Sequence, residues 1–257
     1  ERNFFLVGYL KKNRPGVKIR EYDSTSDALD AVSKKEADAY IGNRAAADYL
    51  IEKELLRNLR IQGKVKETSS INSIGVRKDW PILADILDKA LASLTREEVR
   101  AVYVKWGAMG SDEEMSFSWL SLGTEEKAWL NEHRVIRAAS DPKYAPVEYL
   151  DDDGRVKGIS IDYLNLIAQK LGVEIVHVSA PSWEETREMF KQGKLDFFSA
   201  LALTPERQGT VLFTQPYLTL PTAIFTRNEI PYINNLDELA GRKVAVVRGY
   251  AIIDWVR

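Results

Sequence analysis

The sequence contains no cysteine among its 257 residues and only two histidines, His133 and His177. The lack of cysteine excludes disulfide scaffolds, thiolate zinc sites and cysteine nucleophiles. Two histidines are too few for a histidine-rich metal centre, so we expect neither a metal nor a cofactor. No apolar run approaches the roughly 18 residues that cross a bilayer, and Glu1 opens no signal peptide.

The chain also lacks an excess of charge of either sign. Lys and Arg number 36 against 38 Asp and Glu, a formal net charge of −2. This balance removes the broad electrostatic case for nucleic acid or an anionic membrane surface as a partner. With 45% apolar and 29% charged residues, the composition is that of a globular protein. We expect a soluble α/β protein, or a soluble part of a larger one.

The first hundred residues alternate between strand and helix patterns. Ser24 or Ser26 can cap a helix, Pro81 suits a first helical position, and Thr95 with Glu98 forms a capping box. This alternation predicts crossover units and a mostly parallel sheet. The expected strands cover residues 17–23, 37–42 and 71–77, and the expected helices cover 26–37, 44–56, 81–94 and 95–106.

A second α/β segment begins near residue 123, after a stretch at 107–122 that has no periodicity and reads as a linker. Residues 141–158 read as a long loop or hairpin, and 204–218, with two prolines, as an irregular connection. The expected helices cover 125–133, 159–172, 182–194 and 236–241, and the expected strands cover 135–140, 173–180, 196–203, 220–227 and 243–247.

The two ends of the chain resemble each other. Residues 2–11 match residues 248–257 at a constant offset, with Arg2 aligned to Arg248 and Phe4 to Tyr250. Such a repeat predicts that the chain is one period of a tandem array.

The stretch DPKYAPVEYLDDDGRVKGISIDYLNLIAQKLGVEI, followed by KLDFFSALALTPERQGTVLFTQPYL, resembles type II periplasmic binding proteins, in particular solute-binding family 3. The first segment is similar to the second half of the same family, in DSTSDALDAVSKKEADAYIGN and SIGVRKDWPILADILDKALASLTREEVRAVYVKW. Tandem modules with GVRKDWP and EEKAWLNEH are similar to the periplasmic region of BvgS-type sensor histidine kinases.

This resemblance implies a Venus flytrap, two α/β lobes of mixed sheets flanked by helices, with a ligand held between them. It divides the chain into halves of two tandem modules. Residues 1–106 are the C-terminal half of an upstream module, mostly lobe 2 and returning to lobe 1 from about 71. Residues 107–122 are the linker. Residues 123–257 are the N-terminal half of a downstream module, lobe 1 to about 226 and the start of lobe 2 from about 231.

Each half alone would leave an apolar sheet face uncovered, which burial at ~25 cal/mol per Å² disfavours. We therefore expect the halves to complete one flytrap, either within a chain as a circular permutation or between chains as a swap, giving a homodimer.

Thr204 and Arg207, in TPER, are the sharpest candidates for ligand binding. A guanidinium is a bidentate donor matched to a carboxylate, and a neighbouring hydroxyl adds a hydrogen bond. In the resembling amino-acid binders this pair holds the α-carboxylate of the ligand. The competing interpretation is a surface pair of Arg207 with Glu206 or another acid.

Other candidates follow from the same resemblance. Tyr144 and Tyr149 stand where the family places aromatics that line the cleft, and ordinary packing is the alternative. Three residues end an expected buried strand: Ser199, Ala200 and Leu201. Their backbone groups can donate hydrogen bonds to a ligand in the cleft, and the alternative is plain core packing.

Asn43 stands where amino-acid binders carry an aspartate for the ligand's ammonium group, a departure that weakens an α-amino-acid assignment. Arg248, Gly249 and Tyr250 form an expected strand-to-helix turn whose amides can bind an anion.

Several apparent motifs are better explained without a ligand. Residues 151–154 resemble a calcium loop but lack the remaining ligand spacing and read as a hairpin tip. His177 alternates within a strand and is expected to be half exposed. Three tryptophans read as core: Trp80, Trp106 and Trp129.

The leading functional interpretation is the extracytoplasmic, periplasmic sensing region of a membrane-bound sensor histidine kinase. It binds a small polar solute, an amino acid or another carboxylate, and signals by lobe closure. Membrane attachment would come only from parts outside this segment. The alternative is an ABC-transporter binding protein. The third and least favoured interpretation is an enzyme, which would need a placed acid and base. Candidate carboxylates exist, but no two of them have a distinctive spacing: Asp141, Glu148 and Asp162.

Overall fold

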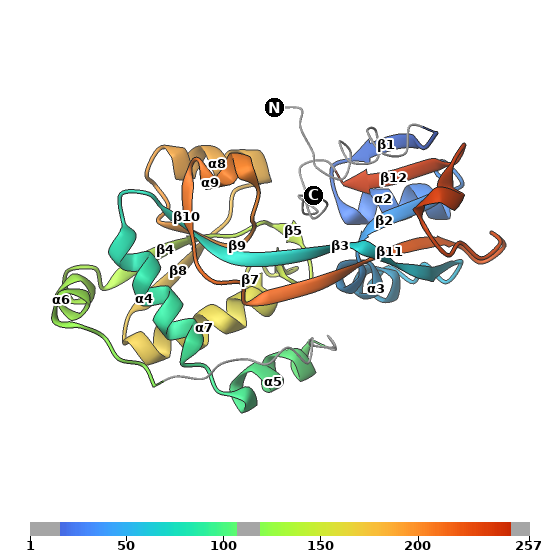
Figure 1. Ribbon diagram of the computed structural model, residues 1–257. Helices are drawn as coiled ribbons and strands as arrows, with labels where there is room; N and C mark the ends of the chain where they lie inside the picture. The colour runs from blue at the N-terminus through green and yellow to red at the C-terminus, as the bar shows by residue number, and fades with distance from the viewer. Residues whose placement is uncertain (1–15, 107–118, 248–257) are drawn as a thin grey trace. The chain divides into compact units, whose positions relative to one another are not determined.

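The computed structural model describes residues 16–106 and 119–247, which form two units (Figure 1). Unit 1 comprises the described residues up to Ile71 and those from Leu220 onward, and unit 2 runs from Asn72 to Thr219. Strands β3 (Leu59–Arg77) and β11 (Leu218–Arg227) each contribute residues to both units. Each unit therefore contains elements from before and after the expected linker.

The sheet of unit 1 interleaves strands from the two ends of the described chain. Its order is β1 (Lys18–Tyr22), β12 (Lys243–Val247), β2 (Ala39–Asn43) and β11. β12 is parallel to both β1 and β2, and β2 is antiparallel to β11. An early strand thus alternates with a late one across the sheet.

Both faces of this sheet are apolar, because successive strand side chains point to opposite sides. In β12, Val244 and Val246 pack with the 3-10 helix η1 (Leu236–Leu239) in one cluster. Ala245 and Val247 pack on the other face, in a cluster with α2 (Thr25–Ser33) and α3 (Arg44–Lys53). The continuous apolar run KVAVV is therefore that of a strand covered on both sides.

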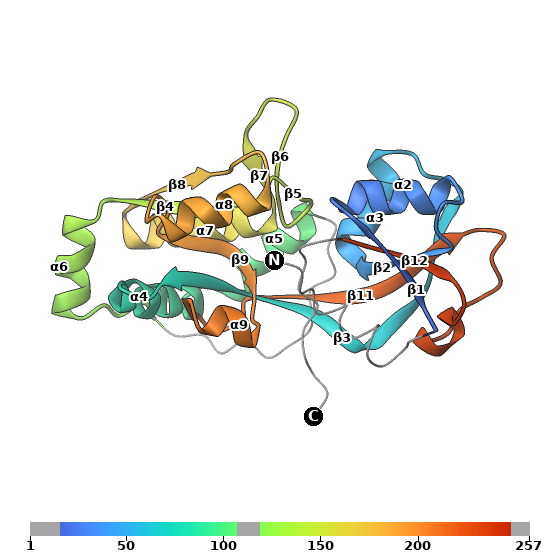
Figure 2. The same cartoon turned by 90° about the horizontal axis from the view of Figure 1, so that it is seen from above.

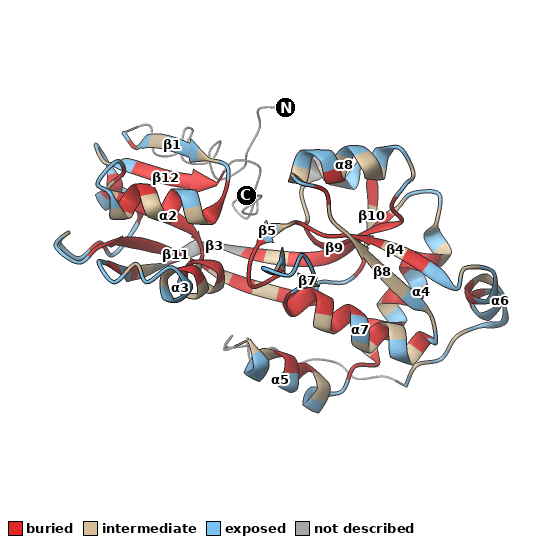
Figure 3. Cartoon of the chain, turned by 180° about the vertical axis from the view of Figure 1, so that it is seen from behind, coloured by how far each residue is buried: buried red, intermediate tan, exposed pale blue. Residues whose placement is uncertain are grey.

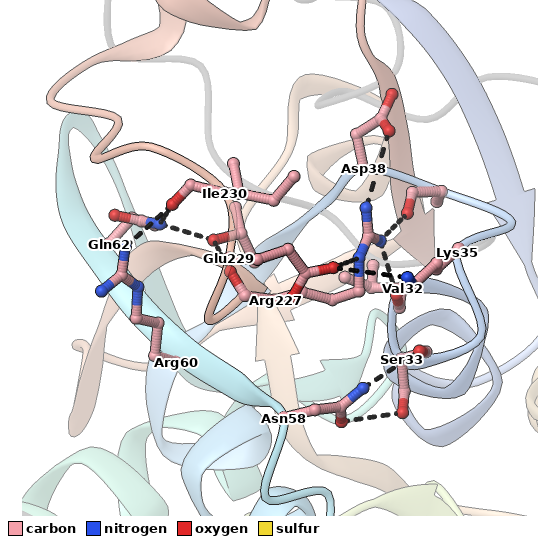
Figure 4. Close-up of polar contacts among 12 residues, drawn as sticks. Val32, Ser33, Lys35, Asp38, Asn58, Arg60, Gln62, Arg227, Glu229 and Ile230 are labelled. Atoms are coloured by element: carbon pink, nitrogen blue, oxygen red, sulfur yellow. Dashed lines mark hydrogen bonds and ion pairs between the residues drawn. The ribbon is translucent and has the colours of Figure 1, made fainter.

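A buried arginine fastens α2 to β11 (Figure 4). The Arg227 guanidinium is 7% exposed and donates 2.7 Å hydrogen bonds to the carbonyls of Val32 and Ala37. It also forms an ion pair with Glu229 at 2.9 Å and lies 3.9 Å from Asp38. A cation here satisfies carbonyls at and after the helix C-terminus, where it is electrostatically favoured.

Unit 2 has a mixed sheet with helices on both faces. β3 is antiparallel to β9 (Phe197–Ala202) and β10 (Val211–Phe213), and β9 and β8 (Glu174–Val178) both run parallel to β4 (Val135–Ala139). Figure 1 shows α8 (Trp183–Lys191) and α7 (Ile159–Leu171) on opposite sides of these strands. In Figure 3 the face of α7 toward the sheet is buried, whereas α8 is exposed along its outer side.

The remaining elements of unit 2 lie around this sheet. A small antiparallel sheet projects from it in Figure 2: β5 (Lys143–Tyr144), β6 (Glu148–Leu150) and β7 (Val156–Lys157). The other helices are α4 (Pro81–Ala92), α5 (Arg96–Lys105), α6 (Thr124–Glu132) and α9 (Pro205–Gln208).

The signals for helix ends are confirmed. Ser24, rather than Ser26, caps α2 by accepting a hydrogen bond from the Asp27 amide. Thr95 and Glu98 form both bonds of the capping box at α5. α7 ends at Gly172, whose φ of 66° is the left-handed conformation that glycine adopts readily.

Three expectations about local structure are wrong. Residues 204–218 are not merely irregular, because α9 and β10 lie within them. β3 spans 19 residues, far beyond the expected strand at 71–77. The tryptophans at 80, 106 and 129 are half-buried and not core.

Trp80 and Trp129 meet edge to face at a centroid distance of 5.1 Å, and Trp129 stacks on His133 at 3.9 Å. Aromatic rings at helix ends on a partly exposed surface can stabilise one another by such edge-to-face and stacked contacts.

The predicted mixed α/β class, with sheets flanked by helices, is confirmed. The expected repeat of residues 2–11 in 248–257 lies outside the described residues. The assignment of residues 1–106 and 123–257 to two neighbouring modules stays a prediction.

Candidate functional site

Most of the predicted binding residues lie in unit 2, on β9, on the β5–β6–β7 hairpin and at the start of α9. In the hairpin Tyr144 pairs with Glu148, and Lys143 pairs with Tyr149. Tyr144 is buried, and the half-buried ring of Tyr149 meets Trp106 edge to face at 6.1 Å. Both tyrosines therefore have packing roles, and their predicted contact with a ligand stays a prediction.

Residues Ser199, Ala200 and Leu201 lie on the second half of β9 and are buried. The pairing of β9 with β3 shifts here: Phe198 is opposite Gly75 and Leu201 is opposite Ser73. A bulge of this kind re-aims side chains and is common next to binding sites. Leu201 belongs to the apolar cluster under α8, which is the core interpretation.

β9 pairs with β4 through Phe197 and Phe198, which lie opposite Ala138 and Ala139, and Ser199 follows these two residues. Ser199 and Ala200 thus follow the parallel pairing, at the carboxyl end of the strand. Ligands of open α/β sheets bind at such strand ends.

Thr204 and Arg207 are brought together at α9. The Thr204 hydroxyl accepts a 3.2 Å hydrogen bond from the Arg207 amide, and Arg207 Nη1 donates a 2.9 Å bond to the Ala202 carbonyl. Both residues are half-buried. The guanidinium is thus held against the end of β9, next to the other predicted residues of this strand. Its role toward a carboxylate stays a prediction.

Asn43 lies in unit 1, at the junction of β2 and α3. Its Oδ1 accepts a 3.1 Å hydrogen bond from the Ala46 amide and so caps α3. Asn43 is buried opposite Thr222, whose hydroxyl has no hydrogen-bond partner within the described residues. A capping role explains a short polar side chain at this position, whether or not it also contacts a ligand.

The predicted anion-binding turn cannot be placed. Arg248, Gly249 and Tyr250 lie outside the described residues.

The apparent calcium loop is the tip of the β6–β7 hairpin. Asp151 Oδ1 accepts hydrogen bonds from the amides of Asp153 and Arg155, so the carboxylate organises its own turn. Within residues 16–106 and 119–247, no group of three or more His, Asp or Glu side chains is placed to hold a metal ion.

A buried polar network behind the end of β9 escaped the sequence interpretation. Ser199 Oγ contacts Glu148 Oε2 and lies 2.8 Å from the Ala139 carbonyl. The Tyr217 hydroxyl donates a 2.7 Å hydrogen bond to the Ser199 carbonyl and lies 2.8 Å from Ser160 Oγ. The signal that could have revealed it is an acid, Glu148, between the apolar residues of VEYL.

The electrostatics of this network are set by burial. Desolvation, with a smaller contribution from the nearby Asp141 carboxylate, raises the pKa of Glu148 to about 8, although the hydrogen bonds with Ser199 and with the Asp141 amide act in the opposite direction. Burial likewise raises the pKa of Tyr217 well above its ordinary value. Both groups are therefore neutral at pH 7.

The three carboxylates considered for an acid–base pair all have protein partners. Asp162 accepts hydrogen bonds from Trp106 Nε1 at 2.7 Å and from Lys105 Nζ at 2.9 Å. Asp141 Oδ1 accepts from the Lys143 amide at 2.8 Å, and Glu148 is buried in the network just described. The arrangement supplies hydroxyls, amides and a guanidinium, which suit binding of a polar carboxylate.

No helix in the described part of the chain combines the length and the apolar character needed to cross a membrane.

Comparison with known proteins finds similarity to a solute-binding family, to two sensor proteins and to a binding protein. Residues 136–248 match the family described as bacterial extracellular solute-binding proteins, family 3. The virulence sensor protein BvgS of Bordetella bronchiseptica is 26% identical over 98% of the chain and 20% of its own length. The sensor protein EvgS of Escherichia coli O157:H7 is 23% identical over 86% of the chain and 18% of its length.

A third relative is a probable histidine-binding protein of Campylobacter jejuni, 28% identical over 45% of the chain and 44% of its length. The predicted resemblance to family 3 and to BvgS-type sensors is confirmed. The chain spans about a fifth of the length of the sensor relatives. The predicted extracytoplasmic location agrees with the family's description as extracellular.

Proposed function

We propose that this chain, a relative of BvgS-type sensors, is the solute-binding region of a periplasmic sensor and takes a small polar ligand that carries a carboxylate. Thr204 and Arg207 of unit 2 bind the carboxylate, with the end of β9 beside them. By the family resemblance, Asn43 stands at the position of the acid that holds the ammonium group of an amino-acid ligand. Binding of the ligand is the event that the sensor reports.

The observation that carries this proposal is the position of Arg207. Its Nη1 is fixed on the Ala202 carbonyl, which orients a planar fork of N–H donors. Pre-orientation lowers the entropy lost when a carboxylate binds. An arginine held in this way at a strand end suits recognition better than a mobile surface arginine does.

The test uses L-histidine, because one relative is a probable histidine-binding protein, and 3-(imidazol-4-yl)propanoate, which lacks the ammonium group. We expect calorimetric titration to detect binding of at least one of the two. Because Asn43 is uncharged, the affinities should differ by less than about tenfold, and Asn43→Asp should favour histidine.

The variant Arg207→Ala should weaken binding by about 10- to 100-fold, the loss expected for charge-assisted hydrogen bonds. The matched control is Arg187→Ala, which removes an arginine of α8 that pairs with Glu184 at 3.5 Å. Equal affinities of Arg207→Ala and the control would refute the assigned role. Native mass spectrometry of the purified protein, with no small carboxylate released and neither probe bound, would refute the ligand class.

The second candidate is a transport binding protein, favoured by the histidine-binding relative. It uses the same residues and makes the same binding predictions. The adjoining gene sequence decides between them, because a sensor continues into a membrane helix and a kinase. In either case the chain acts by binding and not by catalysis.

A further inference from the structure

Glu148 is an acid buried without a cation. It is 1% exposed, and within the described residues it forms no ion pair. Its Oε1 accepts a 2.9 Å hydrogen bond from the Asp141 amide, and its Oε2 contacts Ser199 Oγ. A carboxylate in such a place would be a buried, uncompensated charge, which is costly.

A neutral Glu148 lets every polar contact around Ser199 be a hydrogen bond, because Ser199 Oγ faces two acceptors, the Ala139 carbonyl and Glu148 Oε2. Ser199 Oγ has one hydrogen and lies 2.8 Å from the Ala139 carbonyl, which can only accept. Ser140 Oγ, fully buried, has Ser199 Oγ at 3.2 Å as its partner in the described part of the chain. Ser140 therefore donates to Ser199, and Ser199 donates to Ala139. The contact between Ser199 and Glu148 then needs a hydrogen from Glu148.

The titratable groups around Glu148 agree with this assignment. Asp141 approaches from the end of β4, Tyr144 is opposite on β5, and Tyr217 approaches from the segment before β11. Tyr163 of α7 and Tyr103 of α5 surround Tyr217 in turn. Asp141 opposes ionisation of Glu148, and burial raises the pKa of Tyr217 and of Tyr163 above the ordinary value.

We propose that Glu148, as a neutral acid, is a positioning residue that holds Ser199 and the end of β9 in the form that binds the carboxylate ligand, an inference that rests on the proposed function. Loss of the proton draws the Ser199 hydrogen to Glu148 and leaves the Ala139 carbonyl without it. The end of β9, which carries Ala202 and the Arg207 guanidinium fixed to it, then loses its support.

Two pH dependences follow. The pKa of Glu148 is raised from 4.5 to about 8 in the folded unit, so folding takes up a proton between these values. The resulting stability is fully present below pH 4.5 and is lost as the pH rises toward 8. The unfolding equilibrium constant increases up to about tenfold per pH unit in this window. Ligand affinity falls as the pH passes 8.

The direct test is carbon NMR of the full chain labelled at the glutamate side-chain carboxyl carbon. The Glu148 resonance, assigned in the wild type by through-bond correlation with its own backbone amide, should keep the chemical shift of a protonated carboxyl to above pH 7. The exposed Glu132 serves as the internal control. Titration of Glu148 together with Glu132 would overturn the inference, even if Glu148→Gln failed to fold.

The variant Glu148→Gln supplies the same hydrogen to Ser199 and the same acceptor to Asp141, without a titrating proton. It should unfold with little pH dependence between 4.5 and 8, whereas the control Glu132→Gln should keep the wild-type slope. Histidine affinity measured on either side of pH 8 should fall in the wild type and stay constant in Glu148→Gln.

The outcomes separate the two proposals. If the NMR titration midpoint of Glu148 is high and neither probe binds, the proposed function and the positioning role are refuted, whereas the buried neutral acid is confirmed. Normal binding with an ordinary Glu148 midpoint refutes only this inference. If the Glu148 midpoint is high but the affinity for histidine depends on pH equally in the wild type and in Glu148→Gln, the positioning role is refuted.

Discussion

Removal of the Arg227 side chain should destabilise unit 1 more than any surface substitution there. In Arg227→Ala the carbonyls of Val32 and Ala37 lose their 2.7 Å hydrogen bonds in a buried site. The Val32 carbonyl keeps a 3.2 Å hydrogen bond from the Lys35 amide, so the main cost falls on the Ala37 carbonyl, and an unsatisfied buried group costs about 1–3 kcal/mol. The ion pair with Glu229, whose side chain is 55% exposed, adds at most about 1 kcal/mol. We expect a total loss of about 3 kcal/mol.

The assay is urea unfolding followed by far-ultraviolet circular dichroism, with amide hydrogen exchange to localise the effect. Exchange should accelerate most at the end of α2 and in the turn before β2, where Val32 and Ala37 lie. Arg227→Lys should lose about half as much, because an ammonium lacks the planar fork that reaches two carbonyls.

The matched control is Arg60→Ala. Arg60 is exposed and donates a 2.8 Å hydrogen bond to the Ile230 carbonyl, so its removal should cost less than about 1 kcal/mol. Equal losses for Arg227→Ala and Arg60→Ala, or unchanged exchange at the end of α2, would show that the buried guanidinium does not hold the helix.

Three further predictions concern unit 2. Burial lowers the pKa of His177 from 6.5 to about 4. The free energy of unfolding of the unit should therefore be unaffected by His177 above pH 6.5 and fall by about 3 kcal/mol as the pH drops to 4. Urea titrations should show this loss in the wild type and not in His177→Leu. Thr95→Ala removes one bond of the α5 capping box and should cost about 1 kcal/mol in the same assay. Gly158→Ala should cost more than about 3 kcal/mol, because φ is 142° and a Cβ would lie 2.2 Å from the Val147 carbonyl oxygen. Gly154→Ala, at φ 74° in open space, should cost only about 1 kcal/mol.

Local patterns predicted most elements because each depends on neighbours in sequence. The run KVAVV has the length and β-branched composition of a buried strand, and Ser24, Pro81 and Gly172 mark helix ends by backbone chemistry alone. β3 was underestimated because its first half is polar and reads as a loop. Its strand character comes from pairing with distant strands, which no local window contains.

The site was predicted less completely than the fold. Thr204 and Arg207 were found through a motif, and the structure does bring them together at α9. The network of Glu148, Ser199 and Tyr217 was not found, because its two contacting pairs are 51 and 18 residues apart in sequence and meet only in the folded unit. For Asn43, only a ligand contact was considered, although an Asn directly before a helical run is a common N-cap and caps α3 here.

The interleaved sheet of unit 1 constrains the order of folding. β12 lies between β1 and β2, and its Lys243 amide bonds to Asp38, 205 residues earlier. Closing so long a loop costs entropy before any contact is gained, and high contact order slows folding. Unit 2 is continuous from Asn72 to Thr219, so a chain leaving the ribosome can complete it first. β1 and β2 precede unit 2 in the chain, yet they are among the last of the described strands to acquire their neighbours, because the position between them stays unfilled until β12 is made.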